Sequence, residues 1–252
     1  MKRAAIVLAT ALLLLAGCGT SGGEKTSSDG DTTTTTADDK GAGQPPTAKQ
    51  LIAILPKAAD IGADYKVTKT ETGSGTADTT TTTDPEDAEL DAEMKEKCPA
   101  FAELDQSLRG SDNDDEVTRT YATEDDREIE IELDPTPTTF TEENIDKLVD
   151  AINGCGTIEF SASGVDLSMK LKAKRNDSIG DFGVDLSMEA QFQMMGMPME
   201  LGFTGRFFSI DGVGVSVTAS GGFDPESGAT VKGDTDLLEP ISKQLESAVG
   251  SL

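Results

Sequence analysis

The chain has no histidine and no tryptophan among its 252 residues, and aromatic residues make up only 4% of it. Without histidine, the Ser-His-Asp and Cys-His arrangements of hydrolases are excluded, and so are metal sites built on imidazole. No phosphate-binding loop is present, and no glycine motif lies in a dinucleotide-binding context. A pair of carboxylates of the glycosidase type stays open, but the low aromatic content argues against a sugar-stacking cleft. We therefore expect a protein that is not an enzyme and that uses no cofactor.

Positive charge is also scarce, because 21 Lys and Arg stand against 47 Asp and Glu, for a net charge of −26. Such a surface repels nucleic acid, so nucleic acid is not expected as a partner. Solubility explains this charge better than an acidic binding site does. The acidic run 111–116 has alternate oxygen ligands but lacks the turn glycine and the distal glutamate of a calcium loop. We interpret it as a solvated turn.

Long apolar runs are absent except at the N-terminus. Lys2 and Arg3 precede an apolar stretch at 4–15, which is well short of the roughly 20 residues that span a bilayer. The small residues Ala16 and Gly17 then lead directly to Cys18. This segment resembles the bacterial lipoprotein signal, which a peptidase cuts before a cysteine that carries diacylglycerol.

The resemblance implies that residues 1–17 are a signal peptide and that Cys18 is the lipidation site. Two or three acyl chains, one of them typically palmitate, anchor a protein stably to a bilayer. We therefore expect the protein at the cell membrane, lipid-anchored on the extracytoplasmic face, with the membrane itself as its first partner. Cleavage would leave 19 basic and 47 acidic residues, or a net charge of about −28.

Composition divides the rest of the chain into a stalk and one domain. Residues 18–46 are rich in Thr, Gly and Ser and are expected to be a disordered stalk, with its threonines as candidate O-glycosylation sites. Residues 47–252 have enough apolar residues for one core and are predicted to form a single domain. A second low-complexity stretch at 73–84 is predicted to be a loop within that domain.

Only three cysteines are present, and lipidation of Cys18 would leave Cys98 and Cys155. An even pair in an oxidising compartment predicts one disulfide between them. In the chain-entropy model, closing a loop of this length stabilises the fold by about 4 kcal/mol.

Hydrophobic periodicity predicts an α+β fold, in which an antiparallel sheet with a C-terminal meander packs against several helices. The helices are expected at 48–55, 57–61, 85–108, 142–153 with an N-cap at Thr139 or Thr141, and 237–249. Period-two alternation predicts strands at 65–72, 117–123, 127–133, 165–174, 184–194, 199–203, 206–210 and 213–219. In the strand at 127–133, isoleucine and leucine alternate with glutamate, which predicts one buried and one wet face. Cys155 is expected just past the end of its helix at Gly154.

Methionine clusters in the stretch 188–199, around a glycine and a proline. Methionine-rich surfaces adapt to varied apolar ligands, so this stretch and its neighbours give a candidate apolar ligand face. Its residues are Met188, Phe192, Met194, Met199 and Phe203. The alternative interpretation is that Met188 and Met194 are core residues beside a hairpin tip. A copper site of thioether ligands is a weaker alternative.

The arrangement of helices, cysteines and strands resembles the extracellular sensor domain of mycobacterial PknH-type receptor kinases, which also occurs in free-standing actinobacterial lipoproteins. The residues that carry the resemblance are Leu51–Pro56, Cys98-Pro99, Ile145–Asn153 running into Gly154-Cys155, Gly180-Asp181, the hairpin Arg206–Val217 and the terminal helix. The resemblance implies an antiparallel sheet packed on helices around a cleft that binds an unidentified ligand. That family usually has two disulfides where this chain can form one, and no kinase is attached here.

Three functions follow as expectations. The first is a membrane-anchored, sensor-like domain that binds a small apolar or amphipathic ligand. The second is a carrier of lipid or glycolipid in the cell envelope, similar to mycobacterial lipoproteins that hold acylated glycolipids between a curved sheet and helices. The third is a surface scaffold without a small ligand. A large apolar cavity would favour the carrier, a small polar cleft the sensor-like domain, and a filled core the scaffold.

Overall fold

The computed structural model describes residues 45–73, 95–99, 115–136, 141–162, 165–194, 197–223 and 230–252. Within these ranges, no helix is long and apolar enough to cross a membrane. The predicted signal peptide at 1–17, nearly all of the predicted stalk, nearly all of the predicted loop at 73–84 and most of the predicted helix at 85–108 lie outside the described residues.

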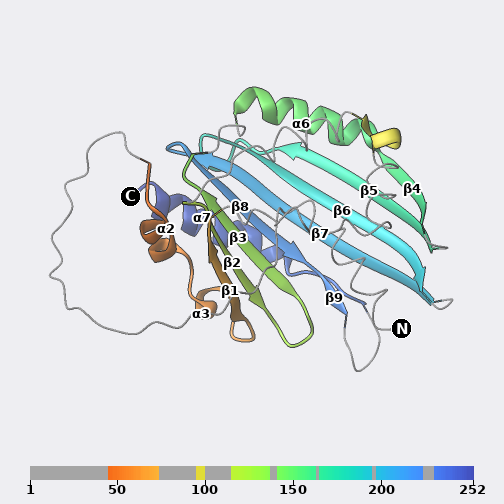
Figure 1. Cartoon of the computed structure of the whole chain (residues 1–252), viewed down its shortest axis with the longest axis horizontal. Helices are drawn as coiled ribbons and strands as arrows, with labels where there is room; N and C mark the ends of the chain where they lie inside the picture. The colour runs from red at the N-terminus through yellow and green to blue at the C-terminus, as the bar shows by residue number, and fades with distance from the viewer. Residues whose placement is uncertain are drawn as a thin grey trace, which may run out of the picture.

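An eight-stranded antiparallel sheet dominates the described part of the chain (Figure 1). Its strands lie in the order β1-β2-β3-β8-β7-β6-β5-β4. Their bounds are β1 Lys66–Thr72, β2 Val117–Ala122, β3 Glu128–Asp134, β4 Thr157–Ala162, β5 Val165–Arg175, β6 Phe182–Met194, β7 Met197–Ile210 and β8 Val213–Ser220. A small second sheet pairs β9 Gly222–Phe223 with β10 Thr230–Val231. The predicted C-terminal meander is confirmed, because β5 to β8 are consecutive neighbours.

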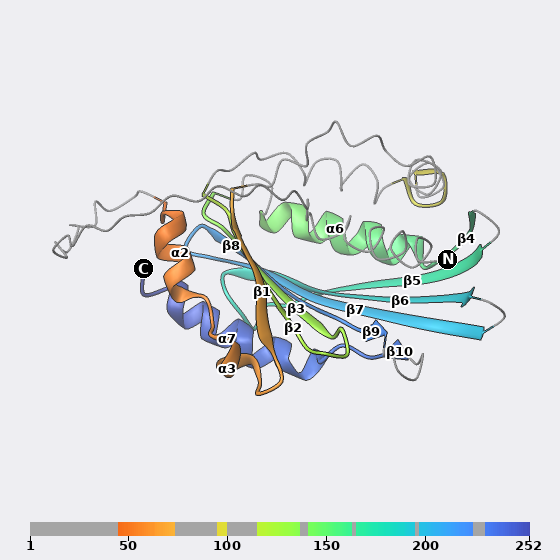
Figure 2. The ribbon, with the colours of Figure 1, turned by 60° about the horizontal axis from the view of Figure 1, so that its bottom comes forward.

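Helices cover the two faces of the sheet over different strands. Helix α6 (Glu142–Cys155) lies against β5 and β6, whereas α7 (Leu238–Val249) lies against β7 and β8. Figure 2 places α6 on one side of the sheet and α7 on the other. The short helices α2 (Ala48–Ile54) and α3 (Ala58–Ile61) lie on the α7 side, and the turn η1 (Thr235–Leu237) leads into α7.

Strand β7 takes part in both cores. Phe203 belongs to the cluster beneath α6, and Phe208 belongs to the cluster beneath α7. The two residues are an odd number of positions apart, so their side chains point to opposite faces of the strand. One face of β7 therefore contributes to the core beneath α6, and the other face contributes to the core beneath α7. The fold therefore has two hydrophobic clusters separated by a single sheet.

The two clusters differ in the elements that build them. The α7 cluster includes Leu51, Tyr121, Ile131, Val217, Ile241 and Leu245, which come from α2, β2, β3, β8 and α7. The α6 cluster includes Ile145, Leu148, Ile152, Ile158, Leu171 and Val184, which come from α6, β4, β5 and β6.

Helix α6 begins where its sequence predicts and ends one residue beyond the predicted end. The Thr141 hydroxyl accepts a hydrogen bond from the Asn144 N–H at 3.3 Å, which confirms Thr141 as the N-cap. The expected end at Gly154 is wrong, because the helix includes Cys155. Gly156, with a φ of 63°, takes the left-handed conformation that ends it.

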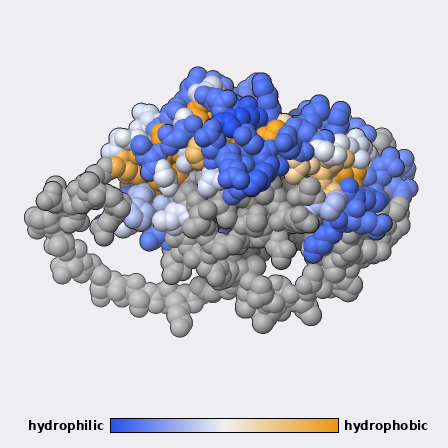
Figure 3. All heavy atoms as spheres, turned by 90° about the horizontal axis from the view of Figure 1, so that it is seen from above, coloured by the Kyte–Doolittle hydropathy of each residue, from blue (hydrophilic) through white to orange (hydrophobic). Residues whose placement is uncertain are grey.

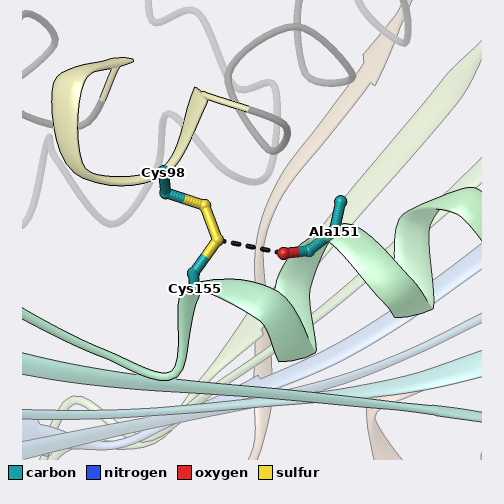
Figure 4. Close-up of a disulfide and its surroundings, with 3 residues drawn as sticks. All are labelled: Cys98, Ala151 and Cys155. Carbon is teal, nitrogen blue, oxygen red and sulfur yellow. Dashed lines mark hydrogen bonds between the residues drawn. A yellow bond between two sulfur atoms is a disulfide. The ribbon is translucent and has the colours of Figure 1, made fainter.

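The predicted disulfide between Cys98 and Cys155 is present, with a Cα–Cα distance of 5.3 Å (Figure 4). Cys155 Sγ lies 3.0 Å from the carbonyl oxygen of Ala151, one turn earlier in α6. Cys98 itself is 2% exposed and packs in the α6 cluster. The bridge therefore fastens the short helical segment at 95–97 to the end of α6.

Strand β3 departs from the predicted alternation of a buried and a wet face. Ile129, Ile131 and Leu133 are buried as expected, but Glu130 on the opposite face is only 6% exposed. Glu128 and Glu132 are half-buried on that same face. The prediction of a wet face is therefore wrong, and β3 carries a row of poorly solvated carboxyl groups.

Candidate functional site

A depression of about 340 Å³, lined by both polar and apolar groups, lies at one end of the sheet, where three segments distant in sequence meet. The first segment connects α3 to β1, the second is the turn between β2 and β3, and the third precedes η1. The residues that line it are Ile61, Gly62, Ala63, Asp64, Tyr65, Arg127, Gly233, Asp234, Thr235, Asp236 and Leu237.

A hydrogen-bond network joins the three segments at the base of the depression. Arg127 Nη1 donates to both carboxylate oxygens of Asp234, at 3.0 and 2.8 Å. The Tyr65 hydroxyl donates to Asp234 Oδ2 at 2.8 Å. Asp234 thus receives its donors from two segments that lie 107 and 169 residues earlier in the chain. Charge-assisted bonds of this kind are stronger than neutral ones, so the base of the depression is a preorganised polar surface.

The tight turn between β2 and β3 orients Arg127. The N–H of Thr123 donates to the carbonyl of Arg127 at 3.0 Å, and the N–H of Arg127 returns a bond to the Thr123 hydroxyl at 3.1 Å. Asp126 takes a positive φ of 58° between them. Arg127 Nε then donates to both oxygens of Asp125 at 3.1 Å. With both partners fixed, the guanidinium group points at Asp234 rather than into solvent.

The surroundings shift the ionisation of these groups. Burial raises the pKa of Tyr65 well above its usual range, and the hydrogen bond to Asp234 raises it further. The Thr123 hydroxyl and the Arg127 guanidinium lower the pKa of Asp125. Bonds to Asp125 and Asp234 raise the pKa of Arg127. At neutral pH the Tyr65 phenol is therefore protonated and the Arg127 guanidinium is charged.

The rim of the depression supplies the groups that a ligand would meet first. Asp64, Thr235 and Asp236 are exposed, whereas Arg127 and Asp234 are already hydrogen-bonded to each other. Carboxylates and a hydroxyl at the rim accept hydrogen bonds from donors. Such a site suits a small molecule with hydroxyl or ammonium groups rather than an anion. Among the described residues, no group of three or more acidic or cysteine side chains is arranged to hold a metal ion.

The candidate apolar ligand face lies at a different place in the fold. Cross-strand pairs join Met188 to Phe203 and Phe192 to Met199, so these four residues share one face of β6 and β7. All four are buried. The side chain of Met194 lies outside the described residues.

Helix α6 covers part of that face and leaves little room there. Met188 and Phe203 belong to the cluster beneath α6. A gap of about 30 Å³ remains beside them, lined also by Ile152 and Leu171. This is the volume of about one water molecule. Seen from above in Figure 3, the described surface is largely hydrophilic, with small separate hydrophobic areas. Binding of an apolar ligand at Met188 and Phe203 would require α6 to move.

The sequence offered weak signals for the depression. Arg127 follows two aspartates in a hairpin turn, and it is one of few cations in a strongly acidic chain. Tyr65 is one of only two tyrosines. Neither feature indicates Asp234 as the shared partner, because that pairing depends on the β3–β8 contact and on how the chain enters α7.

Comparisons of the chain with protein-family models, with curated proteins and with solved structures found no match.

Proposed function

We propose that the chain is a lipoprotein, anchored to the extracytoplasmic face of the cell membrane through Cys18, whose domain binds a small polar ligand without catalysing a reaction. The observation that carries the ligand class is the depression at Arg127 and Asp234, a cleft of about 340 Å³ with a preorganised hydrogen-bond network at its base and carboxylates at its rim, beside apolar groups of Ile61, Ala63 and Leu237. A cleft of this size accommodates a small ligand. The anchor rests on the signal-like sequence that ends at Cys18.

The resemblance to sensor domains of PknH-type kinases supports the same proposal. That resemblance implies an antiparallel sheet with helices and a ligand cleft, and an antiparallel sheet with helices is what this chain forms. The proposed ligand differs from the apolar molecule that the methionine-rich stretch suggests, because the hydrogen-bonding groups of this cleft are carboxylates, a hydroxyl and a guanidinium. Signalling is no part of the proposal.

Lipid carriage is the competing function, and the contacts of α6 weigh against it. Besides the disulfide at its end, α6 is joined to β5 by two hydrogen bonds between the Asn153 side chain and the Ala173 backbone, at 2.9 and 3.0 Å. Near its start, Arg175 of β5 bonds Glu142 at 2.6 Å and Asp146 at 2.7 Å. A carrier would have to break these contacts to open an acyl-sized space beneath the helix.

Native mass spectrometry of the chain, extracted from its own membrane in mild detergent, tests the proposal. We expect a co-purifying polar molecule that is lost from the double variant Asp64→Asn, Asp236→Asn, because both carboxylates line the depression. The matched control is Asp150→Asn on the exposed side of α6, which should retain it. A stoichiometric lipid would support the carrier instead, and no bound molecule in any form would support the scaffold.

A further inference from the structure

Strand β4 is the last strand of the eight-stranded sheet, so no strand among the described residues pairs with its outer edge. The N–H of Leu171 donates to the carbonyl of Gly156 at 3.2 Å, so these two residues form a hydrogen-bonded pair of the antiparallel ladder. Bonded and non-bonded pairs alternate along such a ladder. In the observed register, Ile158 and Phe160 therefore bond β5, and the main-chain groups of Glu159 point away from the sheet.

A lysine from a distant segment already occupies this edge. Lys97 Nζ donates a hydrogen bond to the outward carbonyl of Glu159, and it lies 5.6 Å from the centroid of the Phe160 ring. A cation over an aromatic ring is attracted to the ring face. The next residue along the chain is Cys98, whose disulfide to Cys155 holds this segment beside the sheet (Figure 4).

We propose that the β4 edge is a docking site for an extended, basic peptide segment of another protein, and that Lys97 occupies part of this site in the isolated chain. An extended segment would add a ninth strand by bonding the outward groups of Thr157 and Glu159. One of its lysines would replace Lys97 over the Phe160 ring. Ile158 and Phe160 are buried, so the partner would bind mainly through main-chain hydrogen bonds to the β4 edge and would not enter a deep pocket.

Charge identifies the partner as basic rather than as a second copy of the chain. The chain carries a net charge of −26, so two copies repel one another. If two copies paired through their β4 edges, the exposed Glu159 of one copy would also lie close to Glu159 of the other. The lysines of β5 lie two strand spacings from an incoming strand, about 10 Å, which is near the screening length at physiological salt.

Peptide binding by the full-length chain tests the proposal, with Cys18→Ser to keep the chain unacylated. The probe is a short fluorescent peptide of alternating lysine and threonine, followed by anisotropy, and the control peptide has glutamate in place of lysine. We expect Lys97→Ala to tighten binding of the basic probe about fivefold, because it removes an internal competitor worth about one net hydrogen bond. The acidic peptide should not bind.

Two variants at one position separate edge pairing from simple charge attraction. Glu159→Pro removes the outward N–H but no bond to β5, so it should abolish probe binding. Glu159→Ala keeps that N–H and should weaken binding only partly. Equal binding by both variants, or unchanged or weaker binding by Lys97→Ala, would overturn the proposal.

Because Glu159→Pro could misfold, a second measurement uses the chain with Glu159 unchanged. Hydrogen exchange of the Glu159 amide should slow when the basic probe binds, and an unchanged rate at saturating probe would count against docking here. The depression at Arg127 lies elsewhere in the fold, so either result leaves the proposed ligand site unaffected.

Discussion

At the scale of single residues, the two tyrosines report directly on the fold. Burial raises the pKa of both Tyr65 and Tyr121, and for Tyr65 the bond to Asp234 adds to the effect. They are the only tyrosines in the chain, so an absorbance titration has no background from other phenols. We expect the folded protein to show less tyrosinate at pH 10.5 than the unfolded chain, in which a tyrosine with a pKa of about 10 is mostly ionised.

The raised pKa values of the two tyrosines also determine how the stability of the fold depends on pH. Because the folded pKa of each phenol lies above the unfolded value, the stability it contributes is present below about pH 10 and is lost as the pH rises further. In urea, both phenols should titrate normally near pH 10. A folded-state titration that coincides with the titration in urea would contradict the raised pKa of both phenols.

Arg127 is the second residue whose removal should have a specific effect. Its side chain is 24% exposed and joins Asp125 to Asp234. Arg127→Met would leave the partly buried Asp234 without its cation, so we expect a loss of about 1–3 kcal/mol in the free energy of unfolding. Urea unfolding followed by far-UV circular dichroism measures it.

The matched control is Lys147→Met, which breaks an exposed ion pair with Glu143 on α6. Exposed pairs contribute little, so the control should lose less than about 0.5 kcal/mol. Equal losses in both variants would mean that the network at the depression adds no stability beyond that of a surface pair.

At the scale of elements, the row of carboxyl groups along β3 makes stability depend on pH. Burial, with smaller effects of Glu130 and Asp126, raises the pKa of Glu128 to about 7. Burial, with a smaller effect of Asp134, raises the pKa of Glu116 to about 7. The pKa of Glu132 is also raised, chiefly by burial. These carboxyl groups hold protons in the fold that they release in the unfolded chain.

Stability should therefore increase as the pH falls from 8 to 5. Glu116 and Glu128 have pKa values of about 4.5 when unfolded and about 7 when folded, so their contribution is complete below pH 4.5 and is lost as the pH rises through 7. After allowance for solvent screening, we expect a gain of about 1–3 kcal/mol from pH 8 to pH 5.

Glu128→Gln should flatten this dependence by stabilising the protein at pH 8 with little effect at pH 5. The control Glu143→Gln should leave the slope unchanged, because Lys147 lowers the pKa of Glu143 and its titration falls below this window. Urea midpoints across the pH range provide the measurement. A stability that rises from pH 5 to pH 8 would contradict the burial of these carboxyl groups.

The elements also show which parts of the fold the sequence can predict. Alternation located β2, β3, β5, β6 and β8, because a half-buried strand repeats every two residues whatever covers it. For the same reason alternation could not say which face a helix covers, or that the second face of β3 is also poorly solvated. Thr141 was found because an N-cap is a local feature, whereas the partner of Arg127 depends on contacts across more than 100 residues.

At the scale of the whole molecule, the order of the strands is what assembles the candidate site. β3 pairs with β8, which brings the turn before Arg127 beside the chain that leads into α7. No local pattern predicts this long-range pairing. The disulfide was predictable for a different reason, since only two cysteines remain once Cys18 is assigned to lipid.

The proposed membrane attachment is a property of the entire chain. The strong negative charge of the chain makes a test of it clear-cut. A mature protein with a net charge of about −28 has no electrostatic affinity for an anionic bilayer, so acyl chains would be its only means of attachment under the proposal. We expect Cys18→Ser to move the protein from the membrane fraction to the soluble fraction. The double variant Cys98→Ser, Cys155→Ser removes the disulfide and leaves Cys18 in place, so it should stay in the membrane fraction. Retention of Cys18→Ser on membranes after a high-salt wash would mean that something other than the lipid holds the protein there.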